Sequence, residues 1–190
     1  VTSNAGTAAI TLNAGQFMPV GNTTSGNLIF SNGVSLTTGS GGRALLYTGA
    51  VANAGLTALV GSGSGRFRYG STSSINNFTN WLGASGLYAI YRERPTVSWS
   101  STASQTFDYG NTPVIDTTGS MSGLVNALLE TGGPGSNGSM RAIQLRRAGK
   151  TVATLDLYAF LSQGDNSADV QLLTGDIIYI PPAGARAAVL

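Results

Sequence analysis

The apolar residues of the first hundred positions come in short runs, and Gly, Asn or Ser bounds each run. Runs of about four to eight residues have the length of a strand, and these bounding residues supply turns and positive φ angles. The runs are AAITL at 8–12, NLIF at 27–30, RALLYTG at 43–49, GLYAIYRE at 86–93 and PTVSWS at 95–100. The pattern predicts an all-β segment over 1–119, in which the Gly/Ser-rich stretches connect strands.

From residue 120 the apolar residues follow a helical period instead. They occupy positions i, i+3, i+4, i+7 and i+8 of one helix face: Met121, Leu124, Val125, Leu128 and Leu129. Ser120 is a suitable cap before this stripe, and Gly132, Gly133 and Pro134 end it. The spacing therefore predicts one amphipathic helix at the start of the second segment.

After this helix the sequence predicts a hairpin, a short helix and a second hairpin. In the first hairpin, a strand with Ile143 and Leu145 turns at Ala148 and Gly149 and returns over 152–157. Leu157, Phe160 and Leu161 form a short helical stripe that ends at Gly164. Strands at 169–173 and 176–182 are joined through Thr174, Gly175 and Asp176, and prolines close the last strand.

Together these elements predict a compact α+β unit over 120–190. Its expected core consists of the residues on the helix stripes or near the strand centres: Leu124, Leu128, Ile143, Leu145, Leu155, Phe160, Leu172, Ile178 and Ile180. The predicted fold is therefore mainly β, with an all-β segment at 1–119 followed by a small α+β module at 120–190.

The second segment resembles the SLBB domain, a β-grasp module of bacterial polysaccharide and capsule export proteins. The resemblance covers 132–184 and includes the basic strand, the LDLY turn into a helix, the Gly164–Asp165 pair and the GDIIYIPP strand. It departs from the family at Ala159, where an acid is common. The strand expected before the helix is not recognisable in 100–119, so that strand is altered or is supplied from elsewhere.

The first segment resembles the C-terminal region of filamentous-haemagglutinin-type adhesins of the two-partner secretion route. The matching stretches are 30–59 with its GGR and YT motifs, FRYG at 67–70, and 86–115 with RPTV and FDYGNTP. Both resemblances imply the bacterial envelope, and the joint is expected near 122–127.

Charge and residue usage exclude several function classes. Only 9% of the residues are charged, and the 10 cations and 8 anions are spread along the chain, whereas nucleic-acid binding needs clustered cations. The sequence has no cysteine and no histidine, so thiolate metal sites and a Ser-His-Asp triad are excluded. No apolar run reaches the roughly 18 residues of a membrane-spanning helix. Because the sequence begins at Val1, a processed or excised chain is expected.

Four chemical motifs have a structural alternative that we favour. Lys150, the only lysine, could serve a Ser-Lys dyad but lies beside a predicted turn. Asp165, Asp169 and Asp176 could form a carboxylate pair, and GDNSAD at 164–169 could bind calcium, but turn and capping roles are expected for these acids. The stretch GSGSGRFRYG could cradle a phosphate, but an exposed turn with a two-arginine strand fits better. No enzymatic activity, metal or cofactor is expected.

A carbohydrate-binding surface is the remaining functional hypothesis. Its candidate residues are four cations and two aromatic residues of the second segment: Arg141, Arg146, Arg147, Lys150, Tyr158 and Tyr179. Sugars stack on aromatic planes, and guanidinium groups hold carboxylates and hydroxyls. The alternative is that the arginines form a solvated edge and that the tyrosines are partly buried core.

The combined expectation is a non-enzymatic bacterial protein that is secreted, extracellular or associated with the outer membrane. It is an adhesin or surface scaffold whose β-grasp module binds a polysaccharide or a cell-surface glycan. One alternative is a component of outer-membrane polysaccharide export. A second is a structural filament subunit, with homo-oligomers or filaments as the expected assembly.

Overall fold

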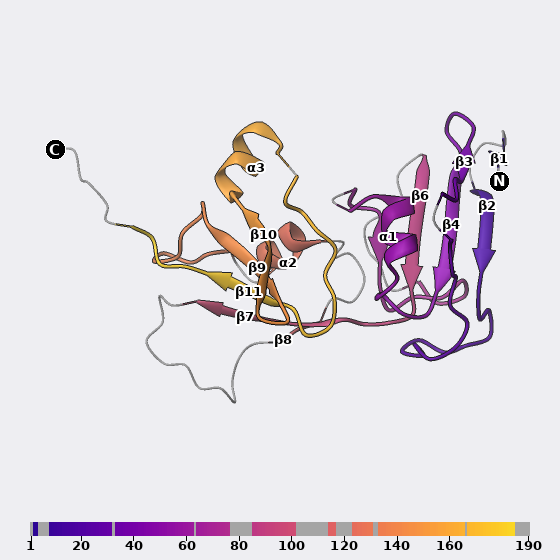
Figure 1. Ribbon diagram of the computed structural model, residues 1–190, viewed down its shortest axis with the longest axis horizontal. Coiled ribbons are helices and arrows are strands. Elements are labelled where there is room, and N and C mark those ends of the chain that lie inside the picture. The colour runs from indigo at the N-terminus through magenta and orange to yellow at the C-terminus, as the bar shows by residue number, and fades with distance from the viewer. Residues whose placement is uncertain are drawn as a thin grey trace. The chain divides into compact units, whose positions relative to one another are not determined.

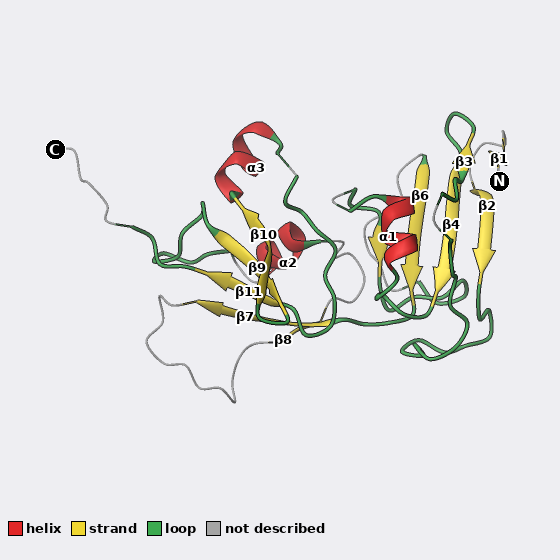
Figure 2. Cartoon of the chain, viewed as in Figure 1, coloured by secondary structure: helices red, strands yellow, loops and turns green. Residues whose placement is uncertain are grey.

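The computed structural model describes residues 2–3, 8–31, 33–62, 64–76, 85–101, 114–116, 123–130, 133–165 and 167–184. Within these ranges the chain forms eleven strands and three helices, so the fold is mainly β, as predicted (Figure 2). The described residues up to Pro95 form one compact unit, and those from Thr96 onward form a second. The second unit therefore begins well before the predicted boundary at 119/120.

Four parallel strands build the main sheet of the first unit. Their spatial order is β2 (Ala8–Asn13), β4 (Arg43–Thr48), β6 (Gly86–Tyr91) and β5 (Phe67–Arg68). Figure 1 shows β2, β4 and β6 side by side, and β4 and β6 pair along their whole length. Two further two-residue strands, β1 (Thr2–Ser3) and β3 (Thr37–Thr38), pair in parallel with each other.

A helix in the first unit corrects the all-β prediction for this segment. Helix α1 spans Ala54–Val60, and the side chain of Asn53 caps it by accepting a hydrogen bond from the Leu56 amide. Leu56 and Val60, one turn apart, are buried, and Gly61 ends the helix with a φ of 91°. The sequence contains the cap, the apolar spacing and the terminal glycine of this helix. Over only seven residues, however, a helical period of apolar residues cannot be distinguished from the pattern of a strand.

The predicted strand at 27–30 does not form. Backbone groups of this segment are hydrogen-bonded to side chains and not to the backbone of a neighbouring strand. The Leu28 amide donates to Thr48 Oγ1 at 3.0 Å, and the Asn53 side-chain amide donates to the Leu28 carbonyl. Asn27 donates to the Thr23 carbonyl and accepts from the Ala50 amide. The segment is therefore an extended loop that is fixed to the strand ends by side-chain hydrogen bonds.

The second unit contains a mixed five-stranded sheet. Its order is β10 (Lys150–Leu155), β9 (Ile143–Arg147), β11 (Ile177–Ile180), β7 (Thr96–Ser101) and β8 (Val114–Asp116). β11 lies in the middle, antiparallel to β9 and parallel to β7, and β8 is antiparallel to β7. The strand predicted at 95–100 thus forms, but it belongs to the second unit.

Three predicted elements of the second unit are confirmed. β9 and β10 form the expected hairpin, whose turn residues Ala148 and Gly149 have positive φ angles of 48° and 76°. Helix α2 spans Leu124–Glu130, and helix α3 spans Leu157–Gln163 and ends at the left-handed Gly164. The cap and end residues proposed for α2, Ser120 and Gly132, lie outside the described residues, as do Met121 and the FDYGNTP motif at 107–113.

The strand predicted at 169–173 is absent, so the second predicted hairpin does not form. Asp169 instead accepts a hydrogen bond from the Val125 amide at the start of α2, and the Gln171 carbonyl accepts one from Arg147. These bonds fix the segment to α2 and β9 and leave β11 to pair with β9 and β7. Leu172 is nevertheless fully buried, as its apolar character suggests.

The predicted core of the second unit is confirmed with one exception. Eight of the nine residues are buried: Leu124, Leu128, Ile143, Leu145, Leu155, Leu172, Ile178 and Ile180. Phe160 is only half-buried, although it lies on the same face of the short helix α3 as the buried Leu157. Phe160 is therefore a peripheral residue and not a central one.

The loss of stability on truncating a core residue to alanine should be larger for a fully buried residue than for a half-buried one. We expect Leu145→Ala to lower the free energy of unfolding of the second unit by about 2 to 5 kcal/mol, since it removes fully buried atoms. Phe160→Ala should lower it by only about 1 to 2 kcal/mol, since part of the Phe160 side chain is exposed to water already. Urea unfolding followed through the amide signals of β9 and β11 measures both values. Equal losses for the two variants would contradict the burial pattern.

Candidate functional site

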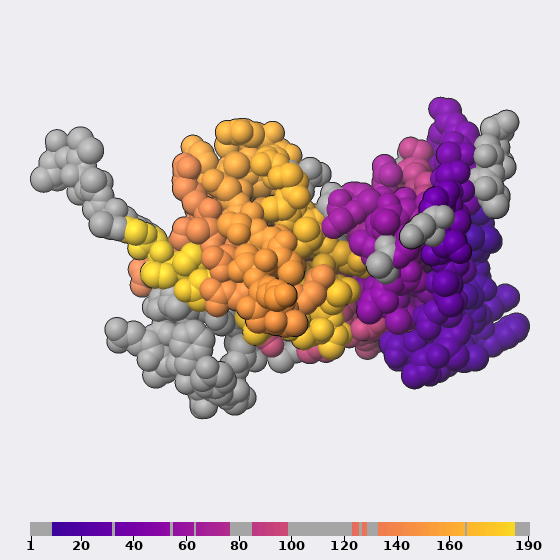
Figure 3. Space-filling view, viewed as in Figure 1, coloured from indigo at the N-terminus to yellow at the C-terminus, as the bar shows by residue number. Residues whose placement is uncertain are grey.

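The six predicted binding residues lie on different parts of the second unit. Arg146 and Arg147 end β9, Lys150 begins β10, Tyr179 lies in β11 and Tyr158 in the first turn of α3. Arg141 precedes β9 by two residues. In Figure 3 the orange residues of β10 and α3 lie at the visible surface of this unit. The structure brings four of the six together as two pairs, each with one arginine and one tyrosine.

The first pair is Arg146 and Tyr179. β9 and β11 are neighbours, with Gln144 opposite Tyr179 and Arg146 opposite Ile177, so Arg146 and Tyr179 are diagonal neighbours on one face. The guanidinium carbon lies 3.8 Å from the centre of the Tyr179 ring, within cation–π range. Gln144 Oε1 accepts hydrogen bonds from Arg146 Nε and Nη2 at 3.0 and 2.9 Å. Gln144 thus fixes the guanidinium against the ring.

The second pair is Arg141 and Tyr158. The guanidinium carbon of Arg141 lies 4.8 Å from the centre of the Tyr158 ring. The Arg141 side chain is 68% exposed, and Tyr158 is 52% exposed. The Leu157 amide donates to the Met140 carbonyl at 2.7 Å, so the start of α3 is fixed to the loop that carries Arg141. This backbone bond brings the two side chains together although they are 17 positions apart.

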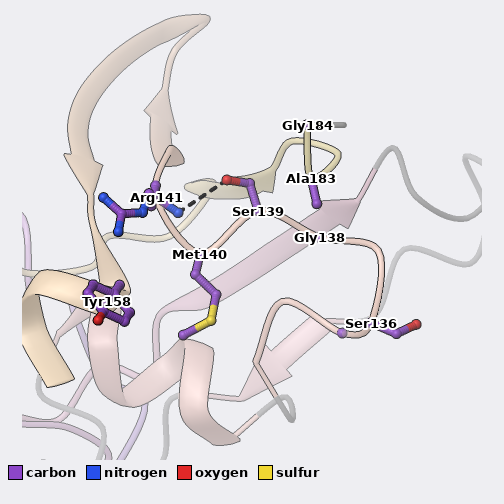
Figure 4. Close-up of a pocket in the computed structure, with 9 residues that line it drawn as sticks. Ser136, Gly138, Ser139, Met140, Arg141, Tyr158, Ala183 and Gly184 are labelled. Atoms are coloured by element: carbon purple, nitrogen blue, oxygen red, sulfur yellow. Dashed lines mark hydrogen bonds between the residues drawn. The ribbon is translucent and has the colours of Figure 1, made fainter. Parts of the chain in front are cut away.

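A pocket of about 440 Å³ lies beside this second pair (Figure 4). Arg141 and Tyr158 line one side of it in the figure, Met140 lies near its middle, and Ser136, Ala183 and Gly184 lie on the other sides. The loop around it is held by backbone bonds from Ser139 to the Pro181 carbonyl and from Ala183 to the Asn137 carbonyl. The volume lies within the range of about 300 to 1,000 Å³ that is typical of small-molecule sites.

The backbone of the pocket loop leaves no room for side chains at one position. A Cβ atom at Gly138 would lie 2.0 Å from the Pro134 carbonyl oxygen, so the chain can pass there only with glycine. Ser139 follows, and its Oγ accepts a hydrogen bond from the Arg141 amide at 3.1 Å, the dashed line in Figure 4. Since a hydroxyl can also donate, Ser139 keeps a donor for a ligand.

Arg147 does not belong to a binding surface, which corrects the sequence prediction. Its Nε and Nη2 donate to the two carboxylate oxygens of Asp176 at 2.7 Å each, and Nη2 also donates to the Gln171 carbonyl. The Asp176 side chain is completely buried, and that of Arg147 is 35% exposed. Alternation along β9 places Arg147 on the same face as the buried Ile143 and Leu145, which explains why it points inward.

Lys150 is exposed at the first position of β10. Its side chain forms no hydrogen bond or ion pair with the described residues. It therefore adds positive charge near the hairpin turn, but the structure does not bring it into either arginine–tyrosine pair.

The acids considered for catalysis or calcium binding are bonded to backbone amides. Asp165 accepts from the Ser167 amide, and its hydrogen bonds with Ser167 lower the pKa of the Asp165 carboxyl. Asp169 accepts from the Val125 amide, and burial raises the pKa of its carboxyl. Asp176 accepts from the Leu173 amide in its own turn. Each acid thus has a turn or capping role, as we expected from the sequence.

No group of metal-binding side chains occurs among the described residues. In the same ranges, no helix is both long enough and apolar enough to cross a membrane.

The Gly-rich stretch GSGSGRFRYG of the first unit matches neither the phosphate cradle nor the exposed two-arginine strand that its sequence suggested. Arg68 is buried, and its Nη1 donates to the Gly65 and Phe67 carbonyls at 2.9 and 2.8 Å. Because these bonds direct the guanidinium at its own backbone, Arg68 neither cradles an anion nor forms an exposed two-arginine strand.

Sequence reasoning missed two residues of the candidate site. Gln144 lies two positions before Arg146 on the same face of β9, a spacing that could have indicated the contact. Asp156 caps α3 by accepting from the Ala159 amide at 2.9 Å, and its Oδ2 lies 3.9 Å from Arg141 Nη1. An acid directly before a helical stripe is a capping signal, but the contact with Arg141 depends on the tertiary fold.

Neither the models of known protein families nor the curated proteins contain a match to this chain.

Proposed function

We propose that this chain is a non-enzymatic bacterial surface protein, of the adhesin or scaffold type, whose second unit binds an acidic glycan. The proposal places it outside the cell or at the outer membrane, in line with the two resemblances of its sequence. The observation that carries the glycan-binding part is the exposed Arg141–Tyr158 pair at the edge of a pocket of about 440 Å³. The export and filament alternatives stay predictions.

The second unit is, in this proposal, a β-grasp module. Its elements run as an antiparallel strand pair (β7 and β8), a helix (α2), a hairpin (β9 and β10), a second helix (α3) and a last strand (β11) in the middle of the sheet. The parallel pairing of β11 with β7 supports this assignment, because it supplies the first strand that the sequence of 100–119 does not reveal. That strand would come from 96–101 instead.

The chemistry of the pocket fits a sugar that carries a carboxylate. A guanidinium can hold a carboxylate through two parallel hydrogen bonds, and an aromatic ring offers an apolar plane for the C–H face of a pyranose. Ser139 adds a hydroxyl for a sugar hydroxyl. Bonding of Asp165, Asp169 and Asp176 to backbone amides supports a binding role rather than acid–base catalysis.

Binding of a polyuronate should depend on Arg141. We expect the wild-type chain to bind alginate but not neutral dextran, and the affinity should fall as salt rises, because screening weakens exposed charge pairs. Arg141→Gln should weaken alginate binding about tenfold or more, since it removes charge-assisted hydrogen bonds. Calorimetric titration measures these affinities.

Arg94→Gln is the matched control, because Arg94 is an exposed arginine of the first unit. This variant should bind alginate like the wild type. Equal binding of alginate and dextran, or equal effects of the two substitutions, would overturn the proposal.

A further inference from the structure

The guanidinium of Arg141 differs from its neighbours in the use of its donors. Arg147 donates hydrogen bonds to Asp176 and to the Gln171 carbonyl, and Arg146 donates to Gln144. From the Arg141 guanidinium, no hydrogen bond reaches another residue in the part of the chain that the structure describes. Arg141 is held by the Tyr158 ring instead, which leaves its N–H groups available to a ligand.

A carboxylate of the protein already lies close to these donors. Asp156 Oδ2 is 3.9 Å from Arg141 Nη1, which is too far for a hydrogen bond but close enough for electrostatic attraction. The other oxygen, Oδ1, is bonded to the Ala159 amide as the cap of α3. The cap therefore holds the carboxylate beside Arg141 without letting it form the two parallel hydrogen bonds that a free carboxylate could form.

We propose that Asp156 is a resident competitor for Arg141 and sets the affinity of the pocket for carboxylate-bearing sugars. The ligand is a uronic acid residue whose carboxylate takes the two donors of Arg141 and whose ring lies against Tyr158. Asp156 repels this carboxylate and attracts Arg141 in the free protein, so both effects oppose binding. The identity of the ligand rests on the glycan-binding function proposed above.

Asp156→Asn tests this role, because it removes the charge and keeps the cap. Asn and Asp are about equally good caps, so α3 should persist and the melting temperature should change little. Glucuronate, glucose and acetate are the probes, and the side-chain Nε–Hε signal of Arg141 is followed by NMR during each titration. We expect Asp156→Asn to bind glucuronate about two- to fivefold more tightly than the wild type, the effect of one partly exposed charge pair.

Two further comparisons define the site. Glucuronate should bind more tightly than acetate, since the sugar ring also contacts Tyr158, and glucose should leave the Arg141 signal unchanged. The Asp156→Asn gain should shrink in an Arg141→Gln background, where only the repulsion between Asp156 and the sugar carboxylate is left, and it should persist in full in an Arg146→Gln background. In the Arg141→Gln background, binding is followed through the Ser139 and Tyr158 amides.

Several results would overturn the inference. They are unchanged or weaker glucuronate binding by Asp156→Asn, an equal gain in the Arg141→Gln background, or the same affinity for acetate as for glucuronate. A failure of the proposed function is separate: alginate would then not bind, whereas glucuronate would still shift the Arg141 signal and respond to Asp156→Asn. If glucuronate shifted the Arg141 signal in neither the wild type nor Asp156→Asn, the inference would be wrong.

Discussion

Arg147→Ala will lower the free energy of unfolding of the second unit by about 3 to 5 kcal/mol. The substitution leaves the carboxylate of Asp176, which is completely buried, without its cation and without two hydrogen bonds of 2.7 Å. The Leu173 amide still donates to the carboxylate, but one neutral donor does not replace the lost hydration and the lost cation. Urea unfolding followed through the β9 and β11 amide signals measures the loss, independently of the first unit.

Two comparisons separate this effect from a general sensitivity of the hairpin. Arg146→Ala, one position earlier, should lower the free energy by only about 1 kcal/mol, because its partners Gln144 and Tyr179 are neutral. The double variant Arg147→Ala with Asp176→Asn should be more stable than Arg147→Ala alone, since no buried charge is left unpaired. A double variant that is less stable than the single one would contradict this account.

Arg92→Ala will destabilise the first unit by about 3 to 5 kcal/mol and release the loop at 14–27 from the end of β6. The Arg92 residue is 2% exposed, and burial lowers the pKa of its guanidinium. Its nitrogens donate to backbone carbonyls of that loop: Ala14 at 2.6 Å, Gly15 at 3.5 Å, Asn22 at 3.2 Å, Ser25 at 2.6 Å and Gly26 at 2.8 Å. Loss of the side chain leaves several part-buried carbonyls without partners at once.

Hydrogen exchange gives the most direct measurement of the Arg92 effect. The Gly21 amide donates to the Arg92 carbonyl at 2.8 Å, so its protection reports whether the loop is still attached. Arg92→Lys should be intermediate, because a lysine keeps the charge but cannot reach as many carbonyls as the planar guanidinium. Arg94→Ala, an exposed position in the same segment, should change stability by no more than about 0.5 kcal/mol. If the Gly21 amide exchanged as slowly in Arg92→Ala as in the wild type, the hydrogen bonds from Arg92 to the loop carbonyls would not be what holds the loop.

Local features of this protein were predictable from its sequence. The β9–β10 hairpin followed from two apolar runs around Ala148 and Gly149, and the end of α3 followed from Gly164. The buried positions of α2 and of the strands followed from their spacing. These features depend on φ and ψ preferences and on periodicity within a few residues, and such preferences act whatever the remote partners are.

For the candidate site, the sequence predicted the residue types but not which of them are exposed and which are paired. Composition picked out the arginines and tyrosines, but it did not separate Arg147, which pairs with a buried acid, from Arg146, which lies against Tyr179. Neighbouring strand residues point to opposite faces, so the choice between core and surface depends on which face the rest of the chain covers. The same holds for Asp156, whose cap role is local but whose contact with Arg141 is not.

Tertiary structure alone decided which distant segments meet. The pairing of β7 with β11 joins residues about eighty positions apart, and it places a strand that the sequence analysis assigned to the first segment in the second unit. Arg92 likewise donates to backbone carbonyls about seventy positions away. The loop that carries them contains no acidic residue from which this contact could be predicted. Backbone donors and acceptors are the same at every residue, so no sequence pattern records their partners. Local sequence preferences determined the turn of the β9–β10 hairpin and the end of α3, and the packing of the whole chain determined which predicted strands form and which segments they pair with.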